Sequence, residues 1–304
     1  MKSLTAIALL AAAFAAAPLR AQSIDPAVRG ATDALTADQR QQLSAYLSAQ
    51  AEKFGSADPS QVVAVRNELC KVLRDAKTRD GFRREFGAEF VRQFGKFATA
   101  SDPLRATNVF IVARHAPCGE TVGYLVDTMD PARNRDAALR VAAAEQLRRT
   151  VQPGSLPGTL AVTVAKRAAG FLSTEDQWVA ASREVGVIVD AIKTKALTAE
   201  QVDSIASSLS AAVNALASRA FEPGKSDLGF ALQRALLAVR SDLPDLPTTT
   251  QSRFYEAIGP SVAKLAALRD KQVDGYGSAE KKDALQSITV TAELLTRIRS
   301  GKPR

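Results

Sequence analysis

The sequence predicts an all-α protein of about twelve helices, in which antiparallel helical hairpins stack as an α-solenoid or an irregular helical bundle. Three observations predict this class. Alanine, the strongest helix former, supplies 56 of the 304 residues. Apolar residues recur with the helical period in almost every segment. The stretches between these apolar stripes are short and rich in the residues that begin and end helices.

Two kinds of signal mark the expected helix starts. The segments Thr36–Gln39 and Thr198–Gln201 are capping boxes, in which a threonine and a glutamine satisfy backbone N–H groups of the first turn. Asp-Pro pairs begin at positions 25, 58, 102 and 130, and each is expected to lead into a helix because proline fits the first helical position. The β-branched run 159–164 also allows a strand, and Gly259-Pro260 is expected to interrupt a helix.

The apolar stripes identify the expected core. The segment from 80 to 97 carries five of the twelve phenylalanines, and their spacing places them along one side of a helix: Phe82, Phe86, Phe90, Phe94 and Phe97. The most regular stripe of the second half consists of Val202, Ile205, Leu209, Ala212, Leu216 and Ala220. Such amphipathic helices with short connections pack antiparallel against their neighbours.

The N-terminus has the pattern of a secretory signal peptide. Lys2 precedes a charge-free run from 4 to 17, and Ala21 provides the small residue of a cleavage site. The run is shorter than the ~20 residues that span a bilayer. We therefore expect cleavage after Ala21, a periplasmic or extracellular product and no transmembrane segment. The expected domains are the signal peptide 1–21, an N-terminal helical region 22–151 and a continuous C-terminal helical region 152–304.

Composition excludes several functional classes. One histidine and two cysteines cannot build a zinc finger, a three-histidine zinc site or an iron–sulfur cluster. Removal of Lys2 and Arg20 with the signal peptide would leave 38 basic and 32 acidic residues, a net charge of +6. This charge is too dilute for a nucleic-acid-binding protein. We expect no cofactor, no metal and no nucleic-acid partner.

Part of the first half resembles the HEAT and armadillo class of helical repeats. The segment Thr121–Met129 is followed by Asp130-Pro131-Ala132-Arg133 and then by the alanine-rich stretch 137–147. A helix, an Asp-Pro turn with a nearby arginine and an alanine-rich second helix form the pattern of that family. Residues 82–113 match it less closely. The resemblance covers about residues 82–151 and implies a curved helical array with a concave binding surface, but no chemistry.

The two cysteines leave two alternatives open. Cys70 lies at the edge of an apolar helical face, and Cys118 follows His115-Ala116-Pro117. In an oxidising compartment they could form a disulfide, which in the chain-entropy model would contribute about 4 kcal/mol. They could equally be two separate buried thiols, since a free cysteine behaves as a small hydrophobic residue.

His115 also has two interpretations. Its position near Cys118 would suit a thiol–imidazole couple of the kind that activates a nucleophile. We favour a structural histidine at a helix C-terminus, where the negative end of the helix dipole interacts with the ring.

Basic residues accompany the phenylalanine stripe. Arg83, Arg84 and Arg92 could contact an anionic polymer beside the aromatic rings, and they are the anion-contact candidates of the sequence. A buried aromatic stripe with a solvated basic flank is the favoured interpretation, because spacing by four places the rings on one side and the cations beside them.

The sequence contains no complete phosphate-binding loop, nucleophile elbow, dinucleotide fingerprint or EF-hand loop. We therefore expect no catalytic residues and a non-enzymatic scaffold that binds a protein or a cell-envelope component. The first alternative is an anion-binding module for a cell-wall or surface polymer. The second alternative is an enzyme that uses carboxylates, which a single sequence leaves open.

Overall fold

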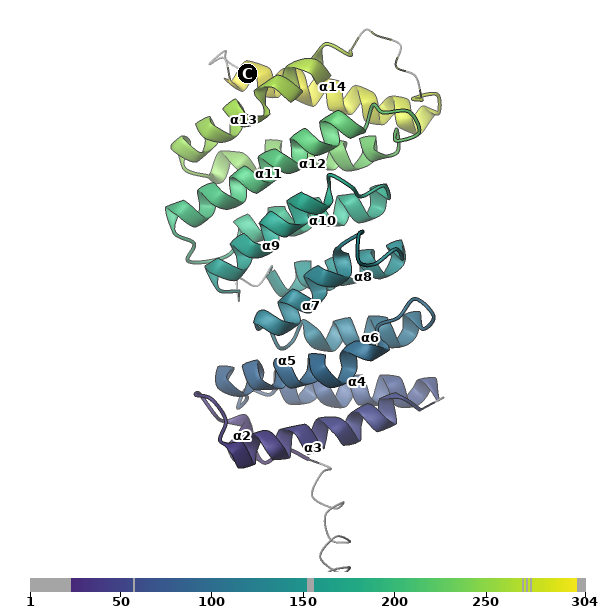
Figure 1. Cartoon of the computed structure of the whole chain (residues 1–304). Helices are drawn as coiled ribbons and strands as arrows, with labels where there is room; N and C mark the ends of the chain where they lie inside the picture. The colour runs from purple at the N-terminus through teal and green to yellow at the C-terminus, as the bar shows by residue number, and fades with distance from the viewer. Residues whose placement is uncertain are drawn as a thin grey trace, which may run out of the picture. The chain divides into compact units, whose positions relative to one another are not determined.

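The computed structural model describes residues 23–56, 58–151, 156–269, 271, 273 and 275–299 (Figure 1). In that part the chain forms thirteen α-helices and no β-strand, which confirms the predicted all-α class. The predicted signal peptide, residues 1–21, lies outside the described residues. None of the helices described is both long and apolar enough for a membrane span.

The chain divides into two compact units, one ending at Thr121 and the other beginning at Val122. This boundary comes earlier in the chain than the expected boundary between the two helical regions at residue 151. The reason is that the helix of residues 137–151 packs against a helix that follows it. The first unit contains α2 (Pro26–Arg29), α3 (Ala37–Phe54), α4 (Pro59–Arg74), α5 (Asp80–Phe94), the 3₁₀ turn η2 (Gly95–Phe97) and α6 (Pro103–Ala113).

The helix α7 (Gly119–Met129) begins at the end of the first unit and continues into the second. The second unit then contains α8 (Ala137–Val151), α9 (Gly158–Phe171), α10 (Trp178–Ile192), α11 (Ala199–Arg219), α12 (Leu228–Asp242), the 3₁₀ turn η3 (Leu243–Asp245), α13 (Thr248–Ala266) and α14 (Ala279–Arg299).

Local sequence signals explain most helix starts. Thr36 and Thr198 each form a complete capping box with the glutamine three residues later. Asp25, Asp58 and Asp102 each accept a hydrogen bond from a first-turn N–H, with proline at the first helical position. These starts agree with the sequence-based predictions.

One local prediction needs correction. Pro260 lies inside α13, which continues through it to Ala266, so the expected interruption at Gly259-Pro260 is absent. Two other predictions are confirmed. Asp130-Pro131 lies in a turn before α8, which begins at Ala137, where Asp136 accepts a hydrogen bond from Leu139 N–H. The run 159–164 is helical as part of α9, and the alternative of a strand there is not found.

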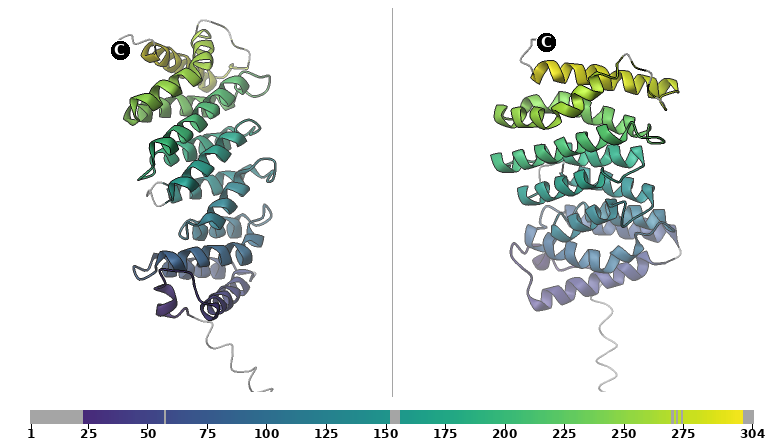
Figure 2. Two further views of the ribbon diagram at one scale, coloured as in Figure 1. Left: turned by 60° about the vertical axis from the view of Figure 1, so that its left-hand side comes forward. Right: turned by 45° about the horizontal axis from the view of Figure 1, so that its top comes forward.

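Each unit is a stack in which a helix packs mainly against the helix two positions further along the chain, and several helices also pack against the next one. In the first unit, α3 packs against α5 and α4 packs against α6. In the second unit, α8, α10, α12 and α14 contact one another in succession, and α9, α11 and α13 form the other row. The two rows of the second unit can be followed in Figure 2.

The core of the first unit is an aromatic ladder on α5. Phe82, Phe86, Phe90 and Phe94 are all fully buried, and successive ring centroids lie 5.7, 6.0 and 4.6 Å apart. Phe54 of α3 closes the ladder, with its ring centroid 5.3 Å from that of Phe94. Four members of the predicted stripe are therefore core residues, whereas Phe97 of η2 is half-buried.

The second unit is built around α10. Eleven of its fifteen residues are buried, because α8, α9, α11 and α12 all pack against it. Small residues permit this close packing, and several alanines of neighbouring helices have no exposed surface: Ala161, Ala165, Ala168, Ala212, Ala231 and Ala235. The high alanine content thus serves the contacts between helices as well as helix formation.

We expect Phe90→Ala to destabilise the protein by about 3–5 kcal/mol, because it removes a fully buried ring that stacks between two others. Urea unfolding followed by circular dichroism would measure the change. Arg84→Ala on the same helix is the control, since Arg84 is exposed. It should change stability by no more than about 0.5 kcal/mol. Equal effects of the two substitutions would contradict a core role for Phe90.

Candidate functional site

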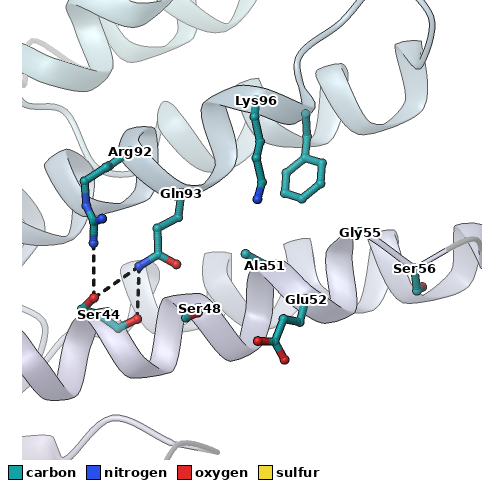
Figure 3. Close-up of a pocket in the computed structure, with 10 residues that line it drawn as sticks. Ser44, Ser48, Ala51, Glu52, Gly55, Ser56, Arg92, Gln93 and Lys96 are labelled. Carbon is teal, nitrogen blue, oxygen red and sulfur yellow. Dashed lines mark hydrogen bonds between the residues drawn. The ribbon is translucent and has the colours of Figure 1, made fainter.

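An open groove of about 750 Å³ lies between α3 and α5 in the first unit (Figure 3). Hydroxyl, amide and charged side chains line most of it. Its lining residues are Ser44, Ser48, Ala51, Glu52, Gly55, Ser56, Arg92, Gln93, Lys96 and Phe97.

Helical spacing places these side chains along the groove. Ser44, Ser48 and Glu52 are four residues apart on α3 and therefore share one face. Arg92 and Lys96 are four apart on α5 and η2. In Figure 3, Arg92 and Gln93 extend from α5 towards Ser44, while the Lys96 side chain extends into the groove.

One end of the groove is closed by a hydrogen-bonded cluster around Glu89. Arg92 donates to Glu89 through two nitrogens, with Nε 2.7 Å from Oε2, and Gln93 donates to the same carboxylate. Gln93 Nε2 also donates to the Ser44 carbonyl at 3.1 Å. Burial opposes the charge of Glu89, but hydrogen bonds from Arg92, Gln93 and Ser44 outweigh it and hold its pKa below the usual range.

The other end of the groove retains unpaired charges. Among the described residues, Lys96 forms no ion pair, and its ammonium lies 5.2 Å from the ring centroid of Phe97. Glu52 on α3 is exposed and likewise has no ion-pair partner in the described part of the chain. The groove therefore offers a free cation, a free anion and several hydroxyl groups over one open surface.

The three predicted anion contacts do not converge. Arg92 lines the groove and pairs with Glu89, whereas Arg83 donates to the Leu73 carbonyl at 3.2 Å and pairs with Asp80. Arg84 is exposed. Arg83 and Arg92 are nine residues apart, two and a half helical turns, so they lie on opposite sides of α5. Arg83, Arg84 and Arg92 therefore do not share one face of α5 from which they could contact a polymer together.

Both cysteines are free thiols and both are buried. Cys118 Sγ lies 3.4 Å from Thr121 Oγ1 and fills the space above Gly87, where an added Cβ would lie 2.5 Å from the sulfur. Of the two alternatives, the structure therefore contains separate buried thiols and not the disulfide. Burial raises the pKa of both Cys70 and Cys118, which is the opposite of what an activated nucleophile requires.

His115 follows α6 and contacts two arginines. Arg74 Nη2 lies 2.9 Å from His115 Nε2, and Arg114 Nε donates to the same nitrogen at 3.2 Å. Burial, Arg114 and Arg74 together lower the pKa of His115 to about 4. The predicted position at the end of a helix is found. Burial, followed by the two arginines, keeps the ring uncharged at neutral pH.

The second unit contains a buried pair of acids. Arg140 donates to both oxygens of Glu175 at 2.7 and 2.8 Å, and the two side chains are 5% and 0% exposed. Glu184 on α10 is 1% exposed, and neither of its carboxyl oxygens has a hydrogen-bond partner. Burial, followed by the charge of Glu175, raises the pKa of Glu184 well above its usual value, although Arg140 opposes this shift.

This pair is the arrangement closest to the carboxylate chemistry that the sequence left open. Glu175 is fixed by Arg140 and also accepts a hydrogen bond from Gln177 N–H at 2.7 Å. Neither acid lines a groove described here, and both are closed off inside the helix stack. Their geometry therefore indicates a structural cluster. Among the described residues, no group of three or more His, Cys, Asp or Glu side chains is arranged to hold a metal ion.

Comparison with known proteins does not extend these observations, since no family model, curated protein or solved structure matches the chain. The sequence interpretation named Arg92 and Lys96 beside the phenylalanine stripe but missed Ser44, Ser48 and Gln93 as groove residues. The spacing of Ser44, Ser48 and Glu52 by four is the signal that could have identified one wall of the groove.

Thiol titration tests the state of the cysteines. Native protein should react slowly with a thiol reagent, because both sulfur atoms are buried and both pKa values are raised. Protein unfolded in guanidinium chloride without reductant should release two thiols per chain. Recovery of no thiol after unfolding would show that Cys70 and Cys118 are oxidised.

Glu184→Gln should stabilise the protein increasingly as the pH rises. Folding raises the pKa of Glu184, so the buried carboxyl group destabilises the folded protein once the pH exceeds the unfolded pKa of about 4.3. This loss of stability grows by about 1.4 kcal/mol per pH unit until the pH reaches the folded pKa. Urea unfolding at pH 4 and pH 8 would measure this difference.

The exposed Glu222→Gln in the same unit is the matched control and should show no comparable pH dependence. A Glu184→Gln effect of the same size at both pH values would contradict a neutral buried carboxyl group at position 184.

Proposed function

We propose that this protein is an exported, non-enzymatic helical binding protein, and that the groove between α3 and α5 binds an extended segment of a protein partner in the cell envelope. The observation that carries the proposal is one open groove that combines Lys96 and Glu52, for neither of which an ion pair is described, with the exposed hydroxyl group of Ser48.

The chemistry of the groove favours a polypeptide. A peptide presents alternating N–H donors and C=O acceptors. The exposed hydroxyl group of Ser48 can serve both, and the side-chain carbonyl oxygen of Gln93 can accept. Lys96 and Glu52 add one charge of each sign. A uniformly anionic polymer would meet the carboxylate of Glu52, and Arg92 is already occupied by Glu89. The mixed lining therefore supports a protein partner over an anionic polymer at this groove.

The rest of the chain supports the same kind of function. The signal-peptide pattern of residues 1–21 indicates export to the periplasm or beyond. The stacked helices, together with the resemblance of residues 82–151 to HEAT-type repeats, are typical of scaffolds that bind through side-chain surfaces. The buried acids are held by Arg140 and by neighbouring helices, away from the open grooves described above.

Site-specific photocrosslinking in the producing cell tests this function. A photoreactive amino acid at Ser48, which is exposed in the groove, should yield a discrete crosslinked protein partner. Lys96→Glu should reduce the yield by about tenfold, because reversal of one charge in a binding site typically costs more than 1.4 kcal/mol.

The matched control places the same photoreactive residue at Ser207, which is exposed on α11 in the second unit. Partners captured equally at Ser48 and Ser207, or capture unaffected by Lys96→Glu, would exclude the groove as the binding site. Recovery of the protein only in the cytosol, with residues 1–21 still attached, would contradict export.

A further inference from the structure

A patch of exposed apolar side chains lies on the second unit, where α10 and α12 pack against each other. Of the fifteen residues of α10, Val179 alone is exposed, at 40%, and the half-buried ring of Trp178 precedes it. On α12, Phe230, Arg234 and Leu237 are four and three residues apart and therefore share one face of the helix. Leu237 is also 40% exposed, so both helices present apolar side chains to solvent.

Two contacts join these side chains into one surface. The ring centroids of Trp178 and Phe230 lie 5.2 Å apart, and the guanidinium carbon of Arg234 lies 5.7 Å from the centroid of the Trp178 ring. Trp178 therefore links the first turn of α10 to the exposed face of α12. Val179 adjoins Trp178 in the chain, and Leu237 lies one turn beyond Arg234. We refer to Trp178, Val179, Phe230, Arg234 and Leu237 as the α10–α12 patch.

The charges around the α10–α12 patch favour a negatively charged partner. Arg234 and Arg240 are exposed residues of α12 for which the structure describes no ion pair. The patch therefore offers positive charge beside its apolar surface. By contrast, the solvent-accessible acids nearest in the chain are each paired with a cation: Asp176 with Arg219 and Lys225, Asp227 with Lys281, and Asp242 with Lys193.

We propose that the α10–α12 patch binds a protein segment in which carboxylate side chains flank aliphatic or aromatic residues. Val179 and Leu237 offer apolar surface to such a segment. A guanidinium group that contacts an aromatic ring, as Arg234 does, can still donate two parallel hydrogen bonds to a carboxylate through its edge. Tryptophan and arginine are also the residue types that most often dominate the binding energy of protein interfaces.

The size of the patch suits a short amphipathic helix. Phe230 and Leu237 are seven residues apart, which corresponds to about 10 Å along α12. A partner helix of two to three turns would cover this length with one apolar face and place acidic residues beside Arg234 and Arg240. The proposal does not depend on the groove between α3 and α5, because the second unit supplies all five patch residues.

A lipid surface fits the same patch less well. The Trp178 ring packs against Phe230 and Arg234, so it is held at the protein surface and is not a free wedge for insertion into a bilayer. Stable attachment to an anionic membrane generally takes a polybasic cluster or a long apolar helix face. The patch instead combines a few apolar side chains with two arginines, which is the composition of a protein interface.

The single tryptophan makes a direct measurement available. Trp178 lies in the patch, so tryptophan fluorescence reports on this surface alone. The probe is a synthetic peptide of about four helical turns without tryptophan, with leucine on one face and glutamate on the other. It should change the fluorescence in a saturable way, with a Kd of about 100 μM or tighter. The same peptide with glutamine for glutamate should bind about tenfold or more weakly, and the peptide with lysine for glutamate should not bind.

Two substitutions in the patch test its two kinds of contact. Arg234→Gln removes the charge, and Leu237→Ser removes exposed apolar surface. Each should weaken binding of the glutamate peptide about tenfold or more. Both side chains are exposed, so the fold should be retained, and circular dichroism verifies this.

Each substitution has a matched control. Lys264→Gln removes an exposed cation from α13, in the other row of helices, and Leu104→Ser changes a leucine of the first unit that is 42% exposed. Both controls should bind the glutamate peptide with the affinity of the parent protein. The absence of a saturable signal up to about 1 mM peptide would overturn the proposal. Equal affinities for the glutamate and lysine peptides, or for the parent protein and Arg234→Gln, would do the same.

Two further measurements separate the other occupants of the patch. Vesicles of equal parts phosphatidylcholine and phosphatidylglycerol should not bind the protein through this surface. Cosedimentation with these vesicles that Leu237→Ser abolishes would assign the patch to a membrane and overturn the proposal. Analytical ultracentrifugation of the parent protein alone tests a second copy of the chain. A dimer that Leu237→Ser dissociates would assign the patch to self-association and would also overturn it.

Discussion

The packing of helices against the helix two positions further along the chain is the constraint on which the rest of each unit depends. An interior helix such as α10 then has neighbours on several sides and little exposed surface. Its residues must be apolar or small, or must find partners inside the stack. Asp190 meets this requirement through Arg148, at 2.7 Å, whereas Glu184 remains without a hydrogen bond and is favoured in its neutral form.

The same constraint explains how far the fold could be predicted. Capping boxes at Thr36 and Thr198 and the Asp-Pro starts at Asp58 and Asp102 depend on a few adjacent residues, so they could be recognised in the sequence. Pro260 could not be judged in this way. Its effect depends on whether packing of α13 against α11 and α14 compensates for a lost backbone hydrogen bond, and that packing involves residues distant in the chain.

The candidate sites show the same division between local and long-range information. Helical geometry alone separates Arg83 from Arg92, because nine residues correspond to two and a half turns, and this part could have been derived from the sequence. The approach of Arg74 to His115 could not, since 41 residues separate them and only the packing of α4 against α6 brings them together. Likewise, Gln93 reaches Ser44 across 49 residues.

His115 has a role that neither interpretation of the sequence anticipated. A carboxylate at this position would hold Arg74 and Arg114 equally well, but it would cancel much of their charge. A neutral imidazole accepts hydrogen bonds from both arginines at one nitrogen and adds no negative charge. Position 115 therefore orders Arg74 and Arg114 through a neutral acceptor, and the 41 residues between Arg74 and His115 explain why the sequence alone did not indicate this contact.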